Sequence, residues 1–176
     1  VKVDVTGLPA ASQLFYRFVV PGQVSAIGRT KTLPAPSATP DVFRFGIGSC
    51  QDFRDGLFTA HRHAAAEGFD AFFFLGDFIY EKNAPGVREH DSPEPVDLAG
   101  YRARYAQYRR DPDLQANFAS CPWVMTWDDH EVVNDYGGLE TPAGALAGFP
   151  ARRAAAYRAY AEWTPIRPAL ADDSSL

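Results

Sequence analysis

The chain has 176 residues, of which 46% are apolar and 14% aromatic, enough to bury the core of one domain or of one domain with part of another. Its net charge of -5 and its lack of a Lys/Arg-rich run argue against a nucleic-acid-binding regulator and against an anionic membrane surface as partner. No stretch approaches the roughly 20 apolar residues that cross a bilayer, and the two cysteines make no disulfide framework.

The first 36 residues are predicted to be all-β. Alternation at 1–5, and runs rich in β-formers at 15–20 and 25–32, predict three short strands separated by turns. Gly-Leu-Pro at 7–9 followed by Tyr16 resembles the tyrosine corner of immunoglobulin-like sandwiches. We therefore expect residues 1–36 to be the last strands of a fibronectin type III-like β-sandwich, which lean on the neighbouring domain.

Both ends of the sequence look like arbitrary cuts. Val1 already falls inside a strand pattern, and Leu176 closes a stretch without a stop signal. We expect an internal fragment of a longer protein, so missing targeting signals carry no weight.

A Pro-rich linker that ends with residues 37–40 predicts a domain boundary, with the second domain spanning 41–176. From Asp41 onward the pattern is β-α-β-α-β, which predicts an α/β fold with adjacent parallel strands and right-handed crossovers. Strands are expected at 42–47, 70–75 and 123–127, and helices at 56–67, 98–119 and 151–163. Pro112 is expected to kink the second helix or divide it into two. The continuous apolar run 70–75 is typical of a strand covered on both faces.

Polar clusters follow all three predicted strands of this sheet, at 48–51, 76–81 and 128–136. In parallel sheets these carboxyl ends meet at one edge, where ligands bind. Thiolate, carboxylate, phenolate and amide ligands would suit a hard or borderline cation, with the sulfur favouring a transition metal. Local alternatives exist for each residue: Asp can cap a helix, free Cys is usually a small buried apolar residue, and Tyr packs well at sheet edges.

Two of these clusters resemble motifs of calcineurin-like metallophosphoesterases. Gly76-Asp77 resembles their Gly-Asp motif, and Asp129-His130-Glu131 resembles their Gly-Asn-His-Glu box, with Asp129 where Asn usually stands. Within that superfamily the chain resembles the PhoD-like alkaline phosphatases over essentially its whole length. The shared pieces are Gly48–Gln51, Gly76–Glu81, Tyr101–Tyr105, Trp127–Tyr136 and Arg152–Tyr157. The fold implied is the front half of a metallophosphoesterase α/β sandwich.

The resemblance also implies a dinuclear or multinuclear site that holds ferric iron and calcium. Asp77 would bridge the metals, with Cys50 as thiolate and Tyr80 as phenolate on the iron. Asp129 or Asn134 would hold the second metal, for which the family implies calcium.

The implied activity is metal-dependent phosphoester hydrolysis of the alkaline phosphatase D type, with inorganic phosphate as product. His130 would act at the leaving-group oxygen as proton donor or transition-state stabiliser. Arg153, in preference to Arg152, would reach the phosphate from the start of the last helix. The resemblance also implies that the protein is secreted or periplasmic. Because further ligands would come from a second half of the domain, we expect this fragment to be inactive alone.

Two rival functions stay open at this point. One is a phospholipase D-like phosphodiesterase of the same family. The other is a non-enzymatic secreted adhesion module, suggested by the fibronectin-like strands, and it leaves the three strand-end clusters unexplained.

Other polar and aromatic residues are assigned structural roles. His61, His63 and His90 are expected to be solvated, and the polar loop 81–97 to be a lid or rim. The tyrosines at 101, 105 and 108 stand one turn apart and are expected to pack in the core. Glu131 is expected to orient the site without binding metal directly.

Overall fold

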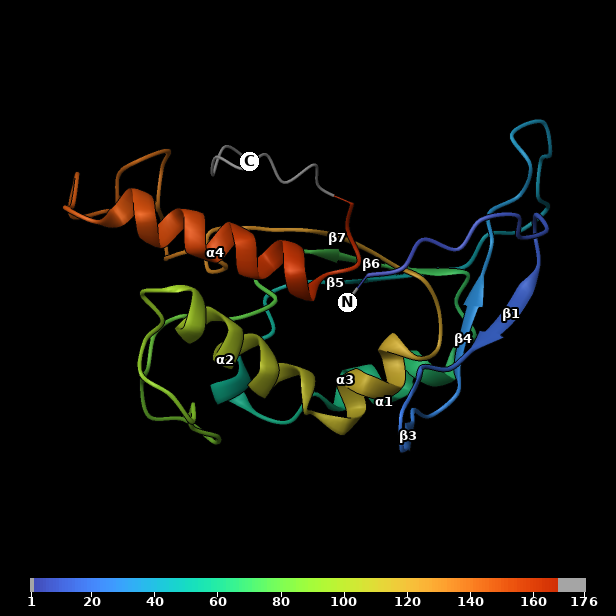
Figure 1. Ribbon diagram of the computed structural model, residues 1–176, viewed down its shortest axis with the longest axis horizontal. Coiled ribbons are helices and arrows are strands. Elements are labelled where there is room, and N and C mark those ends of the chain that lie inside the picture. Colours follow the sequence, from blue (N-terminus) through green and yellow to red (C-terminus); the bar gives the residue numbers. More distant parts are fainter. Residues whose placement is uncertain (1, 168–176) are drawn as a thin grey trace.

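The computed structural model describes residues 2–167, in which a parallel three-stranded sheet lies over a layer of helices (Figure 1). The strands are β5 (Phe45–Gly48), β6 (Ala71–Leu75) and β7 (Trp123–Thr126), and their order β5-β6-β7 confirms the predicted adjacency and parallel direction. The helices are η1 (Phe53–Asp55), α1 (Thr59–Ala66), α2 (Leu98–Arg109), α3 (Pro112–Phe118) and α4 (Phe149–Trp163). No helix in this part of the chain is long and apolar enough to cross a membrane.

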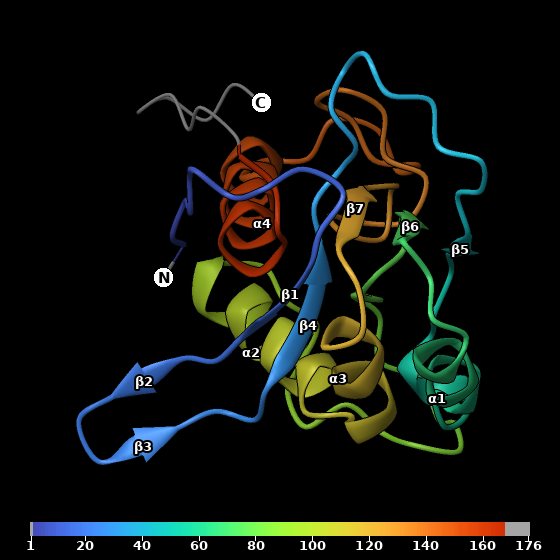
Figure 2. The same cartoon turned by 90° about the vertical axis from the view of Figure 1, so that its right-hand side faces the viewer.

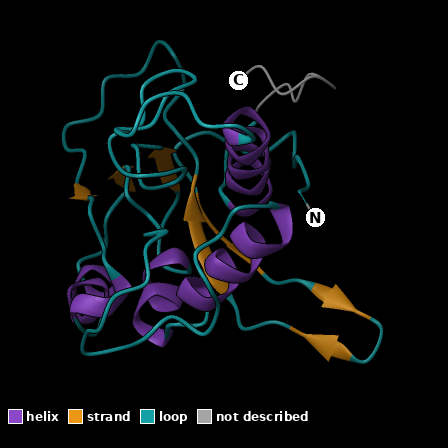
Figure 3. Ribbon diagram, turned by 90° about the vertical axis from the view of Figure 1, so that its left-hand side faces the viewer, coloured by secondary structure: helices purple, strands orange, loops and turns teal. Residues whose placement is uncertain are grey.

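The N-terminal residues form two antiparallel ribbons in place of the three predicted strands. β1 (Gln13–Tyr16) pairs with β4 (Gly28–Lys31), while β2 (Val19–Val20) and β3 (Gln23–Val24) form a hairpin that projects from the body of the molecule (Figure 2, Figure 3). Residues 2–5 form no strand, since their side chains are exposed and no core face selects a register. Val1 and the chain end lie outside the described residues. The fibronectin type III-like architecture stays a prediction.

The β1–β4 ribbon is attached to the rest of the described chain by polar contacts. The backbone N–H and the Nε of Arg29 donate to the carbonyl oxygens of Ala119 and Ser120, each at 2.7 Å. Lys31 forms an ion pair with Asp70. The ribbon therefore packs against the segments that contain Asp70 and Ala119–Ser120, as expected for strands too few to enclose a core of their own.

Aromatic side chains fill the space between the sheet and the helices. Phe72, Phe74 and Trp123 point to this inner face and are buried. β5 carries glycine on that face because the Phe72 ring occupies the space: a Cβ at Gly46 would lie 2.6 Å from the ring. The three tyrosines of α2 are fully buried, which confirms their predicted place in the core.

Asp111 and Pro112 divide the predicted helix 98–119 into α2 and α3. Asp111 has extended backbone angles, and its carboxylate accepts hydrogen bonds from the N–H groups of Asp113 and Leu114 at 3.0 and 3.1 Å. A capping Asp followed by Pro at the first turn starts a new helix, so the chain changes direction there.

The prediction of solvated histidines is wrong for His61 and His90. His61 is 8% exposed and stacks on Trp123 and Phe74. His90 is half-buried and stacks on Phe53. Tertiary stacking partners, which no local pattern shows, account for both.

The outer face of the sheet is apolar and exposed in the described chain. Ile47 of β5, Phe73 of β6 and Val124 of β7 lie in one row across it, and Ile47 and Val124 are 61% and 52% exposed. The expectation that the Phe-rich strand is covered on both faces is therefore met on the inner face only.

Candidate metal centre

The loops that follow the three parallel strands pack against one another at the sheet edge. The N–H groups of Cys50 and Gln51 donate to the carbonyl oxygens of Gly76 and Asp77 at 3.1 and 3.2 Å. Gly76 has φ +103, and a Cβ there would lie 2.6 Å from the backbone nitrogen of Asp128. The Gly of the Gly-Asp motif therefore allows the second and third loops to approach closely.

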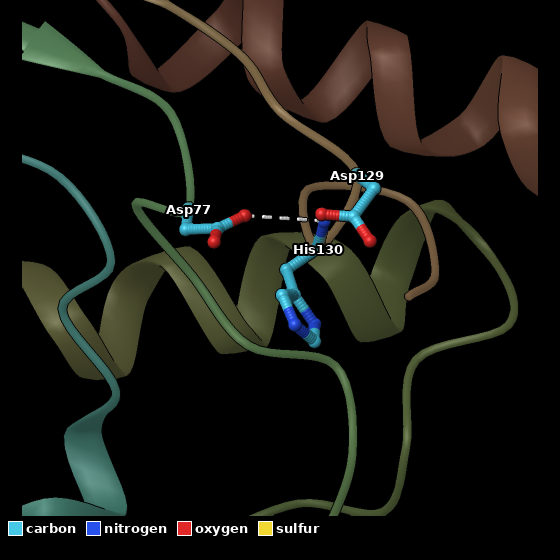
Figure 4. Close-up of side chains that lie close together, drawn as sticks. All are labelled: Asp77, Asp129 and His130. Carbon is cyan, nitrogen blue, oxygen red and sulfur yellow. Dashed lines mark hydrogen bonds between the residues drawn. The ribbon is translucent and has the colours of Figure 1, made fainter. Parts of the chain in front are cut away.

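The Asp77 and Asp129 carboxylates and the His130 ring come together in this place (Figure 4). One candidate ligand atom from each residue lies within 4.8 Å of the others. The backbone N–H of His130 donates to Asp77 Oδ1 at 3.4 Å, and the Tyr80 hydroxyl donates to Asp77 Oδ2 at 3.2 Å. Asp77 and three other predicted site residues, Tyr80, Asp129 and His130, thus lie together, and this oxygen-rich set with an imidazole fits a divalent or trivalent cation.

The pKa values of Asp77 and Tyr80 are both raised in this cluster. Burial raises the pKa of Asp77, and the charges of Asp129 and Asp128 add to the rise, whereas a hydrogen bond from the Cys50 thiol and the charge of His130 oppose it. Burial also raises the pKa of Tyr80, as do the neighbouring Asp77 and Cys50. A bound metal ion would favour the ionised forms of both side chains.

The Glu131 side chain links the loop after β6 to the loop after β7 through hydrogen bonds. It is 1% exposed, and its carboxylate accepts hydrogen bonds from the N–H groups of Asp77, Phe78 and Asp128 at 3.0, 2.6 and 2.9 Å. Burial raises its pKa to about 7, against the effect of these three bonds. Both oxygens of Glu131 are therefore used by backbone groups, and its orienting role stays a prediction.

Glu81 is a site residue that the sequence reasoning missed. It is fully buried, and its Oε2 lies 2.7 Å from His130 Nδ1 while its Oε1 accepts from the N–H of Asn134 at 2.9 Å. The Tyr80 ring stacks on the His130 ring with centroids 4.1 Å apart. A Glu that opens a polar loop looks solvated in sequence, so its position at the end of the Gly-Asp-Phe-Ile-Tyr-Glu motif was the only signal.

The pairing with Glu81 determines the state of the His130 ring. Burial lowers the pKa of His130, but the hydrogen bond to Glu81 and the charges of Glu81, Asp77 and Asp129 outweigh it and raise the pKa overall. With Nδ1 held by Glu81, Nε2 is the nitrogen left for a metal or a substrate oxygen.

Three further predicted site residues make their hydrogen bonds with groups other than Asp77, Asp129 and His130. Asn134 donates to Asp135 Oδ2 at 2.5 Å. Arg152 is held by the Tyr101 hydroxyl at 3.0 Å and by Glu94 at 2.8 Å. Arg153 donates to the carbonyl oxygen of Gly138 at 2.8 Å. Within residues 2–167 neither arginine has a hydrogen bond or ion pair with the Asp77 cluster.

Comparison with known proteins gives matches along nearly the whole chain. The family models described as PhoD-like phosphatase, N-terminal domain, and PhoD-like phosphatase match residues 1–34 and 45–176. Alkaline phosphatase D of Bacillus subtilis (strain 168) is 44% identical over 175 residues, which is 95% of this chain and 30% of that protein. A solved structure described as Structure of PhoD superposes with a TM-score of 0.87 at 44% identity, over 92% of this chain and 32% of that one.

The chain therefore spans about a third of the length of these relatives. The family match covers three quarters of the sequence, and the parallel sheet with its strand-end cluster agrees with it. The chain belongs to the PhoD-like phosphatase family.

Proposed function

We propose that the full-length protein is a metal-dependent phosphoester hydrolase that releases inorganic phosphate, and that this chain contributes the first half of its metal centre. The observation that carries the proposal is the Asp77–Asp129–His130 cluster at the carboxyl edge of the parallel sheet. The similarity to an alkaline phosphatase D supports the same reaction class. Residues 1–36 would serve as a packing domain, 37–40 as the linker and 41–176 as part of the catalytic domain.

The proposed metal ligands are those that surround Asp77. Asp77 would bridge two cations, with Cys50 and Tyr80 on a ferric iron and Asp129 or Asn134 on a calcium. Bound there, the cations would neutralise the charge that develops on the phosphoryl oxygens. The chemistry of the donors supports this division, because thiolate and phenolate suit iron while carboxylate and amide oxygens suit calcium.

The chain's own residues would handle the proton and the phosphate. His130, fixed through Nδ1 by Glu81, would deliver a proton from Nε2 to the leaving-group oxygen. Glu81 would hold the ring orientation and stabilise the charged imidazolium. Arg153 is the better candidate for the phosphate, because its partner is a single carbonyl oxygen whereas Arg152 is held by Tyr101 and Glu94.

Metal content measured by elemental analysis on the full-length protein tests the proposal, with Asp77→Ala and Cys50→Ala as variants. Arg62→Ala, which changes an exposed ion pair with Asp113, is the matched control. We expect iron and calcium in the parent and in the control, and loss of iron in both site variants. A folded parent that binds neither metal would contradict the proposed mechanism.

Substrate choice and the location of the protein need separate tests. Hydrolysis of p-nitrophenyl phosphate compared with bis-p-nitrophenyl phosphate separates a monoesterase from a phospholipase D-like phosphodiesterase.

We also propose that the 176-residue chain is inactive alone and that the full-length protein is secreted or periplasmic. Activity of the isolated chain that Asp77→Ala abolishes would overturn the first statement, and recovery of the protein in the cytoplasm alone would overturn the second.

A further inference from the structure

Helix α2 places a fully buried guanidinium against the Tyr80–Glu81 backbone beside the candidate metal centre. Arg104 is 0% exposed and donates to the carbonyl oxygens of Tyr80 and Glu81 at 2.5 and 3.0 Å. Its other acceptors are Asn83 Oδ1, His90 Nδ1 and the carbonyl oxygens of Ser92 and Pro93, at 2.8 to 3.2 Å. None of these partners is a carboxylate. A buried cation held only by neutral acceptors is costly for the folded state, so its place calls for a function.

The Tyr108 hydroxyl, one turn further along α2, completes the hold on the same segment. It accepts a hydrogen bond from the N–H of Tyr80 at 3.0 Å. Both backbone polar groups of Tyr80 therefore end on α2, the N–H on Tyr108 and the carbonyl oxygen on Arg104. The backbone between these two anchors cannot rotate without breaking one of them.

This short segment carries two side chains that contact the His130 ring. The Tyr80 ring stacks on the imidazole and its hydroxyl meets Asp77, while the Glu81 carboxylate holds His130 Nδ1. A displacement of the Tyr80–Glu81 backbone would therefore move two groups together: Tyr80, a candidate metal ligand, and Glu81, the partner of the candidate proton donor His130.

We propose that Arg104 and Tyr108 are positioning residues of the metal centre, which act through the backbone of Tyr80 and Glu81. The inference rests on the proposed function for its consequence in catalysis but not for its geometry. The rival role for Arg104 is to hold the loop 81–97, because the four acceptors that it has besides Tyr80 and Glu81 all lie in that loop.

Gln107 provides the matched control for that rival. It lies on the same helix, is 4% exposed, and holds the same loop through the N–H and the carboxylate of Asp91 and the carbonyl oxygen of Glu89. It makes no hydrogen bond to Tyr80 or Glu81. Gln107→Leu should loosen the loop without moving the segment beside His130.

The first readout is the NMR shift of the His130 ring protons in the metal-free, full-length protein, because the stacked Tyr80 ring displaces that shift by its ring current. Tyr80→Leu gives the value without the aromatic ring. We expect Arg104→Met to move the His130 shift towards the Tyr80→Leu value, Tyr108→Phe to move it part of the way, and Gln107→Leu to leave it in place. Tyr108→Phe removes only one hydroxyl, so it remains informative if Arg104→Met does not fold.

The second readout is metal affinity, which we expect to fall about 10- to 100-fold in Arg104→Met and to stay unchanged in Gln107→Leu. Equal effects of the Arg104 and Gln107 changes on the His130 shift, or no effect of Arg104→Met and Tyr108→Phe, would overturn the proposal. Absence of metal binding in the parent would refute the proposed function alone, since the NMR comparison needs no metal.

Discussion

Three of the four non-glycine residues with positive φ in the described chain stand in or beside the candidate metal centre. Cys50, Asp77 and Asp135 have φ of 55, 56 and 58°, in the left-handed region that disfavours a Cβ. Each such residue costs on the order of 1 kcal/mol, and the cost persists where function fixes the side chain. The strain is independent support for a site at this edge of the sheet.

Relief of this strain gives a test that needs no metal. Cys50→Gly should be about 1 kcal/mol more stable to unfolding than Cys50→Ala, because glycine adopts φ 55° freely and both variants lose the thiol. At Cys121, which is buried and is not among the positive-φ residues, the order should reverse, with Ala more stable than Gly. Urea unfolding measures both pairs, and equal stability of the two Cys50 variants would refute the strain.

His61 should make the fold sensitive to acid. Burial lowers its pKa from 6.5 to about 4, and the neutral ring is matched to its neighbours: Nδ1 lies 2.9 Å from Asn117 Nδ2 and Nε2 lies 2.8 Å from Gln51 Oε1. Between pH 6.5 and pH 4, His61 binds a proton in the unfolded chain but not in the folded chain. The neutral His61 ring therefore contributes its full stabilisation of the fold above pH 6.5, and this contribution is lost towards pH 4. The loss approaches about 3 kcal/mol.

The comparison of unfolding free energies at pH 7 and pH 4.5 checks this. His61→Gln should lose about half of the acid-dependent decrease relative to the parent, because burial also lowers the pKa of His90 to about 4 and that group keeps its own share. His63→Gln, at an exposed position of the same helix, should retain it. The same slope in His61→Gln and in the parent would show that other groups cause the acid sensitivity.

The helices and parallel strands of residues 41–167 could largely be predicted from sequence, because long periodic runs bury one face whatever their neighbours are. The short N-terminal strands could not, since most of their side chains are exposed and no pattern fixes where pairing starts. The strand-end cluster followed from parallel topology alone. Glu81 and Arg104 did not, because a polar side chain is buried only when partners distant in sequence surround it.

The break between α2 and α3 rests on Asp111, which both caps α3 and pairs with Arg88 at 2.7 Å. Asp111→Asn should keep the cap and lose the ion pair, whereas Asp111→Ala should lose both. We expect Asp111→Ala to be less stable than Asp111→Asn by about 1 kcal/mol, the usual contribution of a cap. Asp113→Ala, which removes the pair with the exposed Arg62, should cost under about 1 kcal/mol. Equal denaturation midpoints for the two Asp111 variants would show that the cap contributes nothing.

In the described chain the two faces of the parallel sheet differ in burial. One face packs on an aromatic core, and the other exposes a row of apolar side chains. Ile47 and Val124 are more than half exposed and flank Phe73, a surface that monomeric proteins rarely leave to solvent. The 176-residue chain should therefore bind an apolar fluorescent dye and self-associate. The double variant Ile47→Lys, Val124→Lys should reduce both several-fold, because charges across the row oppose contact between two such faces. Val87→Lys changes an even more exposed apolar residue in the loop 81–97 and should have no such effect. If dye binding by the double variant matched that of the parent, the exposed β2–β3 hairpin would be the surface responsible, and sedimentation of a Val19→Lys variant would then locate it.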